Sequence, residues 1–178
     1  MNNEENIHTW LRNIANELII ESKEIKKLHS YRGSMFLKKE YDVKLKDDKY
    51  VLNEKIANDC PAIYIFYSPN GIDSIPASFN DVKYGSKAKP QTSENKKFVY
   101  LGKTYTVGER IGCHLESKDS SPYSLKYNHE NRKNVLKNTV LYVFELKQEF
   151  KEYKEVILST IETNLHISCE PLIGSRRV

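Results

Sequence analysis

Apolar and polar residues follow distinct periods along the chain, and these periods predict where strands and helices lie. Three short runs are rich in β-branched and aromatic residues and end at glycine, proline or polar positions, which is typical of buried strands. They are AIYIFY (residues 62–67), FVYLG (98–102) and TVLYVFEL (139–146). The sequence therefore predicts three strands, all in the part of the chain after Pro61.

Helical spacing is found in three other segments. Isoleucines and leucines recur at intervals of three, four or seven over residues 4–28, which predicts an amphipathic helix. Val107, Ile111 and Leu115 recur at fours directly after the second predicted strand, and a similar stripe runs from about 149 to 167. From the first strand onward the order is strand, strand, helix, helical segment, strand, helix. This order predicts an α+β (mixed α/β) fold in which helices cover a small sheet.

The pattern over residues 35–57 is ambiguous. Val43 and Leu45 alternate with lysines, which favours a strand, and the Asp47-Asp48 pair is typical of a turn. After that turn, residues 50–52 have the composition of a returning strand. The sequence alone leaves open whether this part of the chain joins the sheet.

The connection between the first two predicted strands, residues 68–97, is long and polar and contains three prolines. A connection of this length inside a compact domain is usually functional or disordered. Lysines gather in and just after it, and the whole chain carries a net charge of +4 with a pI near 8.8. This balance is compatible with a polyanionic partner, although many proteins of other functions are equally basic.

Length and composition limit the class of protein and the cellular setting. The 178 residues suit one domain with a small appendage, and 39% of them are apolar. No segment has the apolar length of a membrane span, and the first residues lack the form of a signal peptide. The three cysteines are far apart and form no Cys-x-x-Cys pair, which argues against a disulfide framework or a zinc knuckle. We therefore expect a protein of the reducing cytoplasm with no membrane partner.

Four residue types with matching chemistry lie at the margins of the predicted elements. Arg110 and His114 are one helical turn apart and share a face of their helix, while Tyr100 alternates with its neighbours Val99 and Leu101 on a strand. Glu162 lies beside the apolar stripe of the last helix. An arginine can hold a phosphate, a carboxylate can hold Mg²⁺, and a tyrosine can orient or deprotonate water. The set suits phosphodiester hydrolysis, although each residue alone also has an ordinary structural explanation.

Four segments, in the same order, resemble the GIY-YIG nuclease family: AIY (62–64), YLG (100–102), GKTYTVGERIGCHL (102–115) and IETNLHISCEPLIG (161–174). The resemblance covers roughly residues 61–175. It implies a small three-stranded sheet flanked by helices, and hydrolysis of nucleic acid that depends on a divalent metal, Mg²⁺ or Mn²⁺. By this resemblance Tyr64 and Tyr100 are the two motif tyrosines, and Tyr64 activates the attacking water. Arg110, His114 and Glu162 complete the catalytic set, with Glu162 as the single metal ligand.

The chain departs from the family pattern at three points. Alanine replaces the glycine of the first motif at Ala62, and the connection 68–97 is longer than the family's usual hairpin. Gly174 stands where the family often has an asparagine. Extra elements without a separate DNA-binding domain favour a restriction-type or phage-type endonuclease that cuts duplex DNA.

The predicted organisation has two parts. Residues 1–60 form a helical and β extension that grips the substrate or makes a homodimer contact. Residues 61–178 form the catalytic domain, with the insertion at 68–97. Basic residues of the insertion and of the segment after the central helix are expected to contact phosphates: Lys87, Lys89, Lys96, Lys97, Lys103, Lys126, Arg132 and Lys133.

Two other functions remain open at this point. The same fold can bind nucleic acid without cutting it, as a module whose basic surface alone is used. A cysteine hydrolase centred on Cys113, next to His114, is a further alternative, although consecutive helical residues point in different directions.

Overall fold

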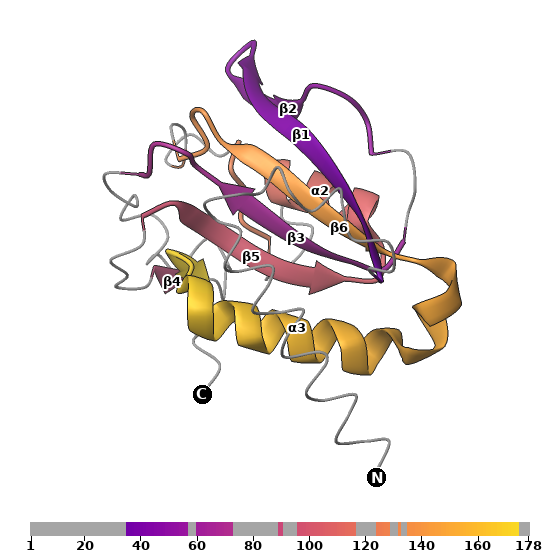
Figure 1. Cartoon of the computed structure of the whole chain (residues 1–178). Helices are drawn as coiled ribbons and strands as arrows, with labels where there is room; N and C mark the ends of the chain where they lie inside the picture. The colour runs from indigo at the N-terminus through magenta and orange to yellow at the C-terminus, as the bar shows by residue number, and fades with distance from the viewer. Residues whose placement is uncertain are drawn as a thin grey trace, which may run out of the picture.

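The computed structural model describes residues 35–56, 60–72, 89–90, 96–116, 124–128, 132 and 135–174, and the predicted helix over residues 4–28 lies outside these ranges. Figure 1 shows the described elements. In chain order they are β1 (Phe36–Lys46), β2 (Lys49–Leu52), β3 (Ala62–Tyr67), β4 (Lys89–Pro90), β5 (Phe98–Thr104), α2 (Val107–Leu115), β6 (Val140–Leu146), the 3-10 helix η6 (Gln148–Tyr153), α3 (Lys154–Cys169) and β7 (Ile173–Gly174).

The strands form one sheet in the order β2-β1-β6-β3-β5-β7-β4. Only the β5–β7 pair is parallel, and the other pairs between described strands are antiparallel. The prediction of a small three-stranded sheet flanked by helices is therefore wrong. The three predicted strands are β3, β5 and β6 at the centre of the sheet, but four more strands extend it on both sides. Among the described residues only two α-helices pack against it, so the fold is mostly sheet and α+β only in the broad sense.

The main extension of the sheet comes from the segment whose pattern was ambiguous. The first half of β1 pairs with β6, from Phe36 opposite Leu146 to Asp42 opposite Val140, and its second half pairs with β2. Asp47 and Asp48, with φ of 48° and 61°, turn the chain between β1 and β2. Positive φ at both central residues is the signature of a tight hairpin turn, so the predicted turn and returning strand are confirmed. Figure 1 shows this hairpin rising beyond the ends of its neighbours.

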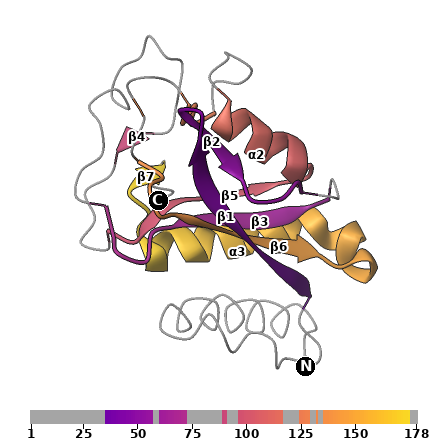
Figure 2. The same cartoon turned by 90° about the horizontal axis from the view of Figure 1, so that it is seen from above.

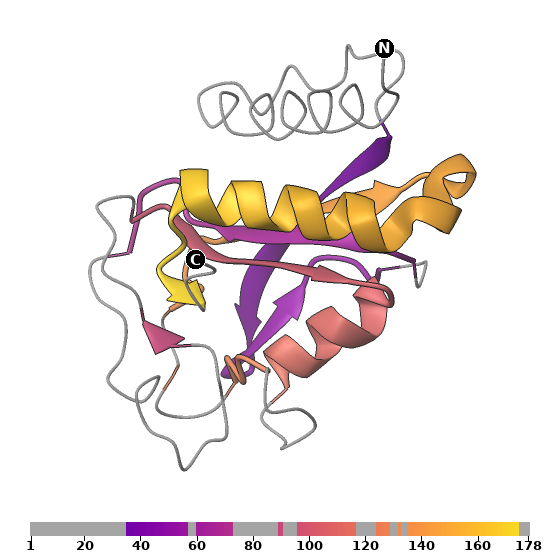
Figure 3. The same ribbon diagram turned by 90° about the horizontal axis from the view of Figure 1, so that it is seen from below.

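The two α-helices cover opposite faces of the sheet, as Figures 2 and 3 show. On β3 the side chains alternate between these faces. Tyr64 and Phe66 join a buried cluster with Val107 and Ile111 of α2. Ile63, Ile65 and Tyr67 join a second cluster with Ile157, Leu158 and Ile161 of α3. All six residues of β3 are buried, because both faces of this central strand are covered.

A β-bulge on β5 alters the predicted alternation around Tyr100. Ile65 pairs with Leu101 and Phe66 with Tyr100, but Tyr67 pairs with Phe98, so Val99 is the extra residue. Val99 and Tyr100 consequently pack against the same buried cluster, on the α2 side. The expectation that Tyr100 points away from both of its neighbours is correct for Leu101 and wrong for Val99, because a bulge shifts the alternation by one residue.

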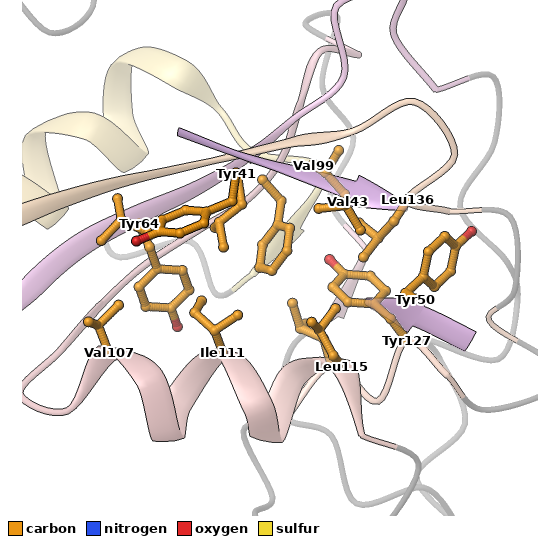
Figure 4. Close-up of a cluster of buried hydrophobic side chains, with 14 of the residues drawn as sticks. Tyr41, Val43, Tyr50, Tyr64, Val99, Val107, Ile111, Leu115, Tyr127 and Leu136 are labelled. Atoms are coloured by element: carbon orange, nitrogen blue, oxygen red, sulfur yellow. The ribbon is translucent and has the colours of Figure 1, made fainter. Parts of the chain in front are cut away.

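Within the described residues, both helices predicted from apolar spacing are found. Val107, Ile111 and Leu115 of α2 are buried and project toward the sheet in Figure 4, as the spacing of four predicts. The last predicted helix is found as η6 followed by α3. Across the part of the chain that the structure describes, no helix has the length and apolar character needed to cross a membrane.

Candidate active site at the edge of β5

Tyr64 lies at the middle of β3 and is completely buried, with 0% of its surface exposed. Its cross-strand partner on β5 is Gly102, and the tyrosine ring lies directly over that glycine. A Cβ atom on residue 102 would lie 2.6 Å from the Tyr64 hydroxyl and 2.8 Å from its Cζ. The glycine of the YLG segment is therefore needed for a packing reason: only a residue without a side chain leaves room for this ring.

Helix α2 brings two side chains to the Tyr64 hydroxyl. The Nε2 atom of His114 lies 2.7 Å from the Tyr64 oxygen, and the Nε–H of Arg110 donates to the same oxygen at 3.3 Å. His114 is completely buried, and its ring also packs edge-on against that of Tyr100, with 5.1 Å between ring centroids. The predicted pair one helical turn apart therefore converges on one phenol. Tyr100 packs beside it, with its ring centroid 6.0 Å from that of Tyr64.

The other nitrogen of His114 is held by the loop that follows α2. The backbone N–H of Leu125 donates to His114 Nδ1 at 3.1 Å. The same loop covers the end of α2, since the N–H of Tyr127 donates to the His114 carbonyl at 2.9 Å. Both ring nitrogens of His114 are thus engaged away from Cys113, so this geometry disfavours a Cys113–His114 nucleophile pair.

Burial dominates the titration of these groups. It raises the pKa of Tyr64 well above the usual 10.0, and the neighbouring Tyr100 adds to the rise, while the positive charge of Arg110 acts in the opposite direction. Burial also raises the pKa of Tyr100, where Arg110 and a hydrogen bond with Tyr64 oppose it. Burial and then Arg110 lower the pKa of His114 well below 6.5, so the imidazole is neutral at pH 7. Both tyrosines are phenols at pH 7 in the free protein.

Glu162 approaches the same strand from the opposite face. It lies on α3 with 5% of its surface exposed, and its Oε1 accepts a hydrogen bond of 3.3 Å from the backbone N–H of Lys103. The Lys103 ammonium donates to the Ser159 hydroxyl on α3. The negative charge of Glu162 also raises the pKa of Tyr100. The groups therefore meet at β5, the strand that carries Tyr100 and Gly102. Tyr64, Arg110 and His114 lie on one face of the sheet, and Glu162 lies on the other.

The donor set suits a hard cation bound by one carboxylate. A carboxylate has about four lone-pair positions, and the Lys103 N–H uses one of them at Glu162. Mg²⁺ commonly takes one or two protein carboxylates and keeps several waters. In the described part of the chain there is no group of three or more His, Cys, Asp or Glu that could hold a metal. Glu162 is the side chain that fits the predicted metal-ligand role.

The structure separates the predicted phosphate-contacting residues into different environments. Lys96 and Lys97 are exposed, and Lys103 is partly exposed and lies beside Glu162. Arg132 and Lys126, however, are buried, with 0% and 3% of their surface exposed. A guanidinium inside the protein does not reach a phosphate on its surface, so we remove both from this group. Lys87 and Lys133 lie outside the described residues, and of Lys89 only the backbone, in β4, is described.

Three features of the site were not found from the sequence. Leu125 acts through its backbone N–H, and the identity of the residue gives no indication of this contact. Arg132 donates from Nη1 to the Leu125 carbonyl at 2.6 Å, inside the protein, although its basic segment is typical of a solvated surface. For Gly102 the sequence indicated a break at the end of the predicted strand 98–102, whereas β5 continues to Thr104 and the ring of Tyr64 packs over the glycine.

Comparison of the chain with protein-family models, with curated proteins and with solved structures finds no match. The case for a function therefore depends on the geometry of the site and on the sequence motifs.

Proposed function

We propose that the protein is a metal-dependent DNA endonuclease of the GIY-YIG type, which hydrolyses phosphodiester bonds in duplex DNA. The single observation that carries the proposal is the convergence on Tyr64: the His114 Nε2 and Arg110 Nε atoms both meet its hydroxyl, beside Tyr100. A purely structural tyrosine does not require two nitrogen donors at one buried oxygen. Burying charged and polar groups is costly unless they are hydrogen-bonded to one another, and clusters of this kind are found preferentially at functional sites.

Each residue has a role that its surroundings allow. Arg110 is half-buried and permanently charged, and its bond to Tyr64 uses one of five N–H donors, so it is suited to hold the scissile phosphate as well. His114 is neutral and supports Tyr64. The tyrosine pair supplies the base that takes a proton from the attacking water.

Glu162 is the residue that would hold Mg²⁺ or Mn²⁺. The cation, when bound, would supply positive charge to the phosphate oxygens as negative charge develops there. Lys103, whose backbone fixes Glu162, would place a second positive charge on the α3 side of the same strand.

The remaining expectations stay predictions. Residues 1–60 are proposed to grip the DNA or to form a homodimer, and β1 and β2 within them belong to the main sheet. A restriction-type or phage-type role is proposed from the elements added to the three central strands, such as the β1–β2 hairpin. All three cysteines are free thiols, which suits action in a reducing compartment such as the cytoplasm.

The proposal is tested with a mixture of plasmid and bacteriophage DNA incubated with the full chain and Mg²⁺ or Mn²⁺, with and without a chelator. Nicked or linear products that disappear with the chelator and with Glu162→Gln support the endonuclease. DNA that is bound but uncut with either metal would refute it and favour the non-catalytic binding module.

A further inference from the structure

The face of β5 that α3 covers changes from buried to exposed along the strand. Leu101 is buried in the cluster with α3, Lys103 is partly exposed and donates to Ser159 of α3, and Tyr105, directly after the strand, is 42% exposed. The change follows from where α3 begins, because its first residue, Lys154, lies beside Tyr105. Figures 1 and 3 show the end of β5 and the start of α3 at the same end of the sheet. An aromatic ring is therefore left at the surface there.

The ring of Tyr105 is held in place although it is exposed. Thr104 Oγ1 donates to the Thr106 carbonyl at 3.3 Å, and the N–H of Thr106 donates to Thr104 Oγ1 at 3.2 Å. These contacts fix the backbone on both sides of Tyr105. The Lys154 Nζ atom lies 5.2 Å from the centre of the Tyr105 ring, within the range of a cation–π contact. A ring that is already ordered loses little conformational entropy when a ligand stacks on it.

Two ammonium groups lie next to this ring and to the candidate metal ligand. Lys103 has its backbone N–H on Glu162 and its ammonium on Ser159, and Lys154 lies over Tyr105. We call Lys103, Tyr105 and Lys154 the β5–α3 strip. The strip leads from Glu162, at the proposed cleavage site, to an exposed aromatic ring.

The strip lies along an uncovered edge and its positive charge is narrow. Among the described strands, β7 pairs with β5 at Tyr100, opposite Ile173, so no described strand pairs with the edge beyond Tyr100. Glu109 on α2 and Glu155 on α3 are exposed on helices that cover opposite faces of the sheet, and their charges oppose phosphates beside the strip. A single nucleic-acid strand fits this charge pattern better than the full width of a duplex.

We propose that the β5–α3 strip binds unpaired nucleotides next to the scissile bond, with a base stacked on Tyr105 and phosphates against Lys103 and Lys154. The proposal rests on the proposed function and narrows its substrate to DNA in which a duplex meets a single strand. In a duplex both faces of a base are covered by its neighbours, so a tyrosine ring stacks only on an unpaired or extruded base. Aromatic rings beside a basic track are the means by which proteins hold single strands.

The spacing along β5 places the unpaired base close to the cut. Lys103 and Tyr105 are two residues apart, about 6.6 Å along an extended chain. A DNA strand advances about 3.4 Å per nucleotide, so Tyr105 meets the base about two nucleotides from the phosphate beside Lys103 and Glu162. The single-stranded arm therefore begins within about two nucleotides of the scissile bond, and the duplex on the other side of the bond remains paired.

The first test measures binding without metal, so that no cleavage is needed. It compares a blunt duplex with the same duplex carrying a single-stranded arm, with 2-aminopurine as the second unpaired base. Tyr105→Leu keeps an apolar side chain but removes the ring, and Tyr105→Phe keeps the ring. We expect the wild type to prefer the armed DNA and to quench its fluorescence. Tyr105→Leu should lose about tenfold of this preference and the quenching, whereas Tyr105→Phe should keep both.

Lys137 provides a matched control for the charge of Lys154. It is exposed and comes shortly before Val140, which pairs with Tyr67 at the end of the sheet where β5 begins, far from Tyr105. In a plot of log affinity for the armed DNA against log salt concentration, Lys154→Gln should lower the slope by about 0.7, and Lys137→Gln should not. The same loss in both lysine variants would overturn the proposal, and so would equal preference for armed DNA in Tyr105→Leu and the wild type.

Cleavage with Mg²⁺ then separates this proposal from the endonuclease itself. Faster cutting of the armed DNA than of the blunt duplex, with the difference lost in Tyr105→Leu, supports both. Binding of the armed DNA that depends on Tyr105, with neither DNA cut, contradicts the endonuclease and leaves the strip as a binding site. Equal cutting of both DNAs by the wild type and by Tyr105→Leu overturns the strip and leaves the endonuclease.

Discussion

Replacement of Gly102 by alanine tests the packing that holds the tyrosine pair. The new Cβ atom would lie 2.6 Å from the Tyr64 hydroxyl, whereas ordinary van der Waals contact begins at 3.4 Å, so the ring has to move by about 3.4 − 2.6 = 0.8 Å. Tyr100 Cε1, at 3.2 Å from the same Cβ, limits escape on that side. Because Tyr64 is fixed by His114 at 2.7 Å and Arg110 at 3.3 Å, a movement of this size breaks at least one of these hydrogen bonds.

The expected cost has two parts. Overpacking a filled core usually costs about 1–3 kcal/mol of unfolding free energy, and we expect Gly102→Ala to fall in that range. Displacement of a catalytic group by about 1 Å commonly costs about 10²-fold in rate, so cleavage should fall by roughly that factor in the variant that still folds.

Gly112 provides a matched control for the same substitution. It lies within α2, and a Cβ there meets nothing within 4 Å. Gly112→Ala should therefore stabilise the protein by about 0.5–1 kcal/mol, since alanine favours a helix. Urea unfolding followed by circular dichroism measures both variants. Equal stability of Gly102→Ala and the wild type would refute the argument, because it would mean that Tyr64 does not lie over the glycine as described.

Three other expectations follow from the site. Glu162→Gln should abolish cleavage, while DNA affinity in a gel-shift titration stays equal or rises because a carboxylate that repels phosphate is removed. Undiminished cutting by the variant would contradict the assignment of Glu162 as the metal ligand. The folded-state pKa of His114 lies below 6.5, so the unfolded chain binds more protons and the free energy of unfolding falls as pH drops below 6.5, by up to about 1.4 kcal/mol per pH unit. His114→Gln should lack this component when urea unfolding at pH 7.5 is compared with unfolding at pH 5. An identical pH dependence of the variant and the wild type would contradict the depressed pKa. Neutralising exposed Lys96 and Lys97 should lower the salt dependence of DNA binding and leave thermal stability unchanged, and an unaltered salt slope would remove this part of the connection from the interface.

The sequence predicted the centre of the fold because its pattern is strong there. The strand β3 is apolar at every position since both of its faces are covered, and the helix α2 shows one clear stripe. The strand β1 was ambiguous for the opposite reason. It lies near the margin of the sheet, and its residues Leu37 and Leu45 are about half exposed. Apolar residues and lysines along this strand therefore do not alternate in a clear period of two. The pairs of residues in β4 and β7 are too short to carry any period.

For the candidate site, sequence spacing placed Arg110 and His114 on one face of a helix, and the structure brings them to the same atom. The residues that contact Arg110 and His114 from distant parts of the chain could not be predicted from sequence spacing. The environment of Arg132 depends on a loop folding back over α2, and the donor at Leu125 is a backbone N–H that every residue except proline possesses. Residue types indicate which chemistry is available, whereas the direction of a hydrogen bond depends on contacts between distant segments.

The placement of the site between two separate hydrophobic clusters has a consequence for how activity responds to heat. Tyr64 and His114 depend on the cluster beneath α2, while Glu162 depends on the cluster beneath α3. Proteins open in parts at a lower free energy than complete unfolding requires. A partial opening that lifts α3 from the sheet would remove the carboxylate and leave the arginine and both tyrosines in place. Warming should therefore produce a form that still holds DNA but no longer cuts it, at a temperature below that at which the sheet melts.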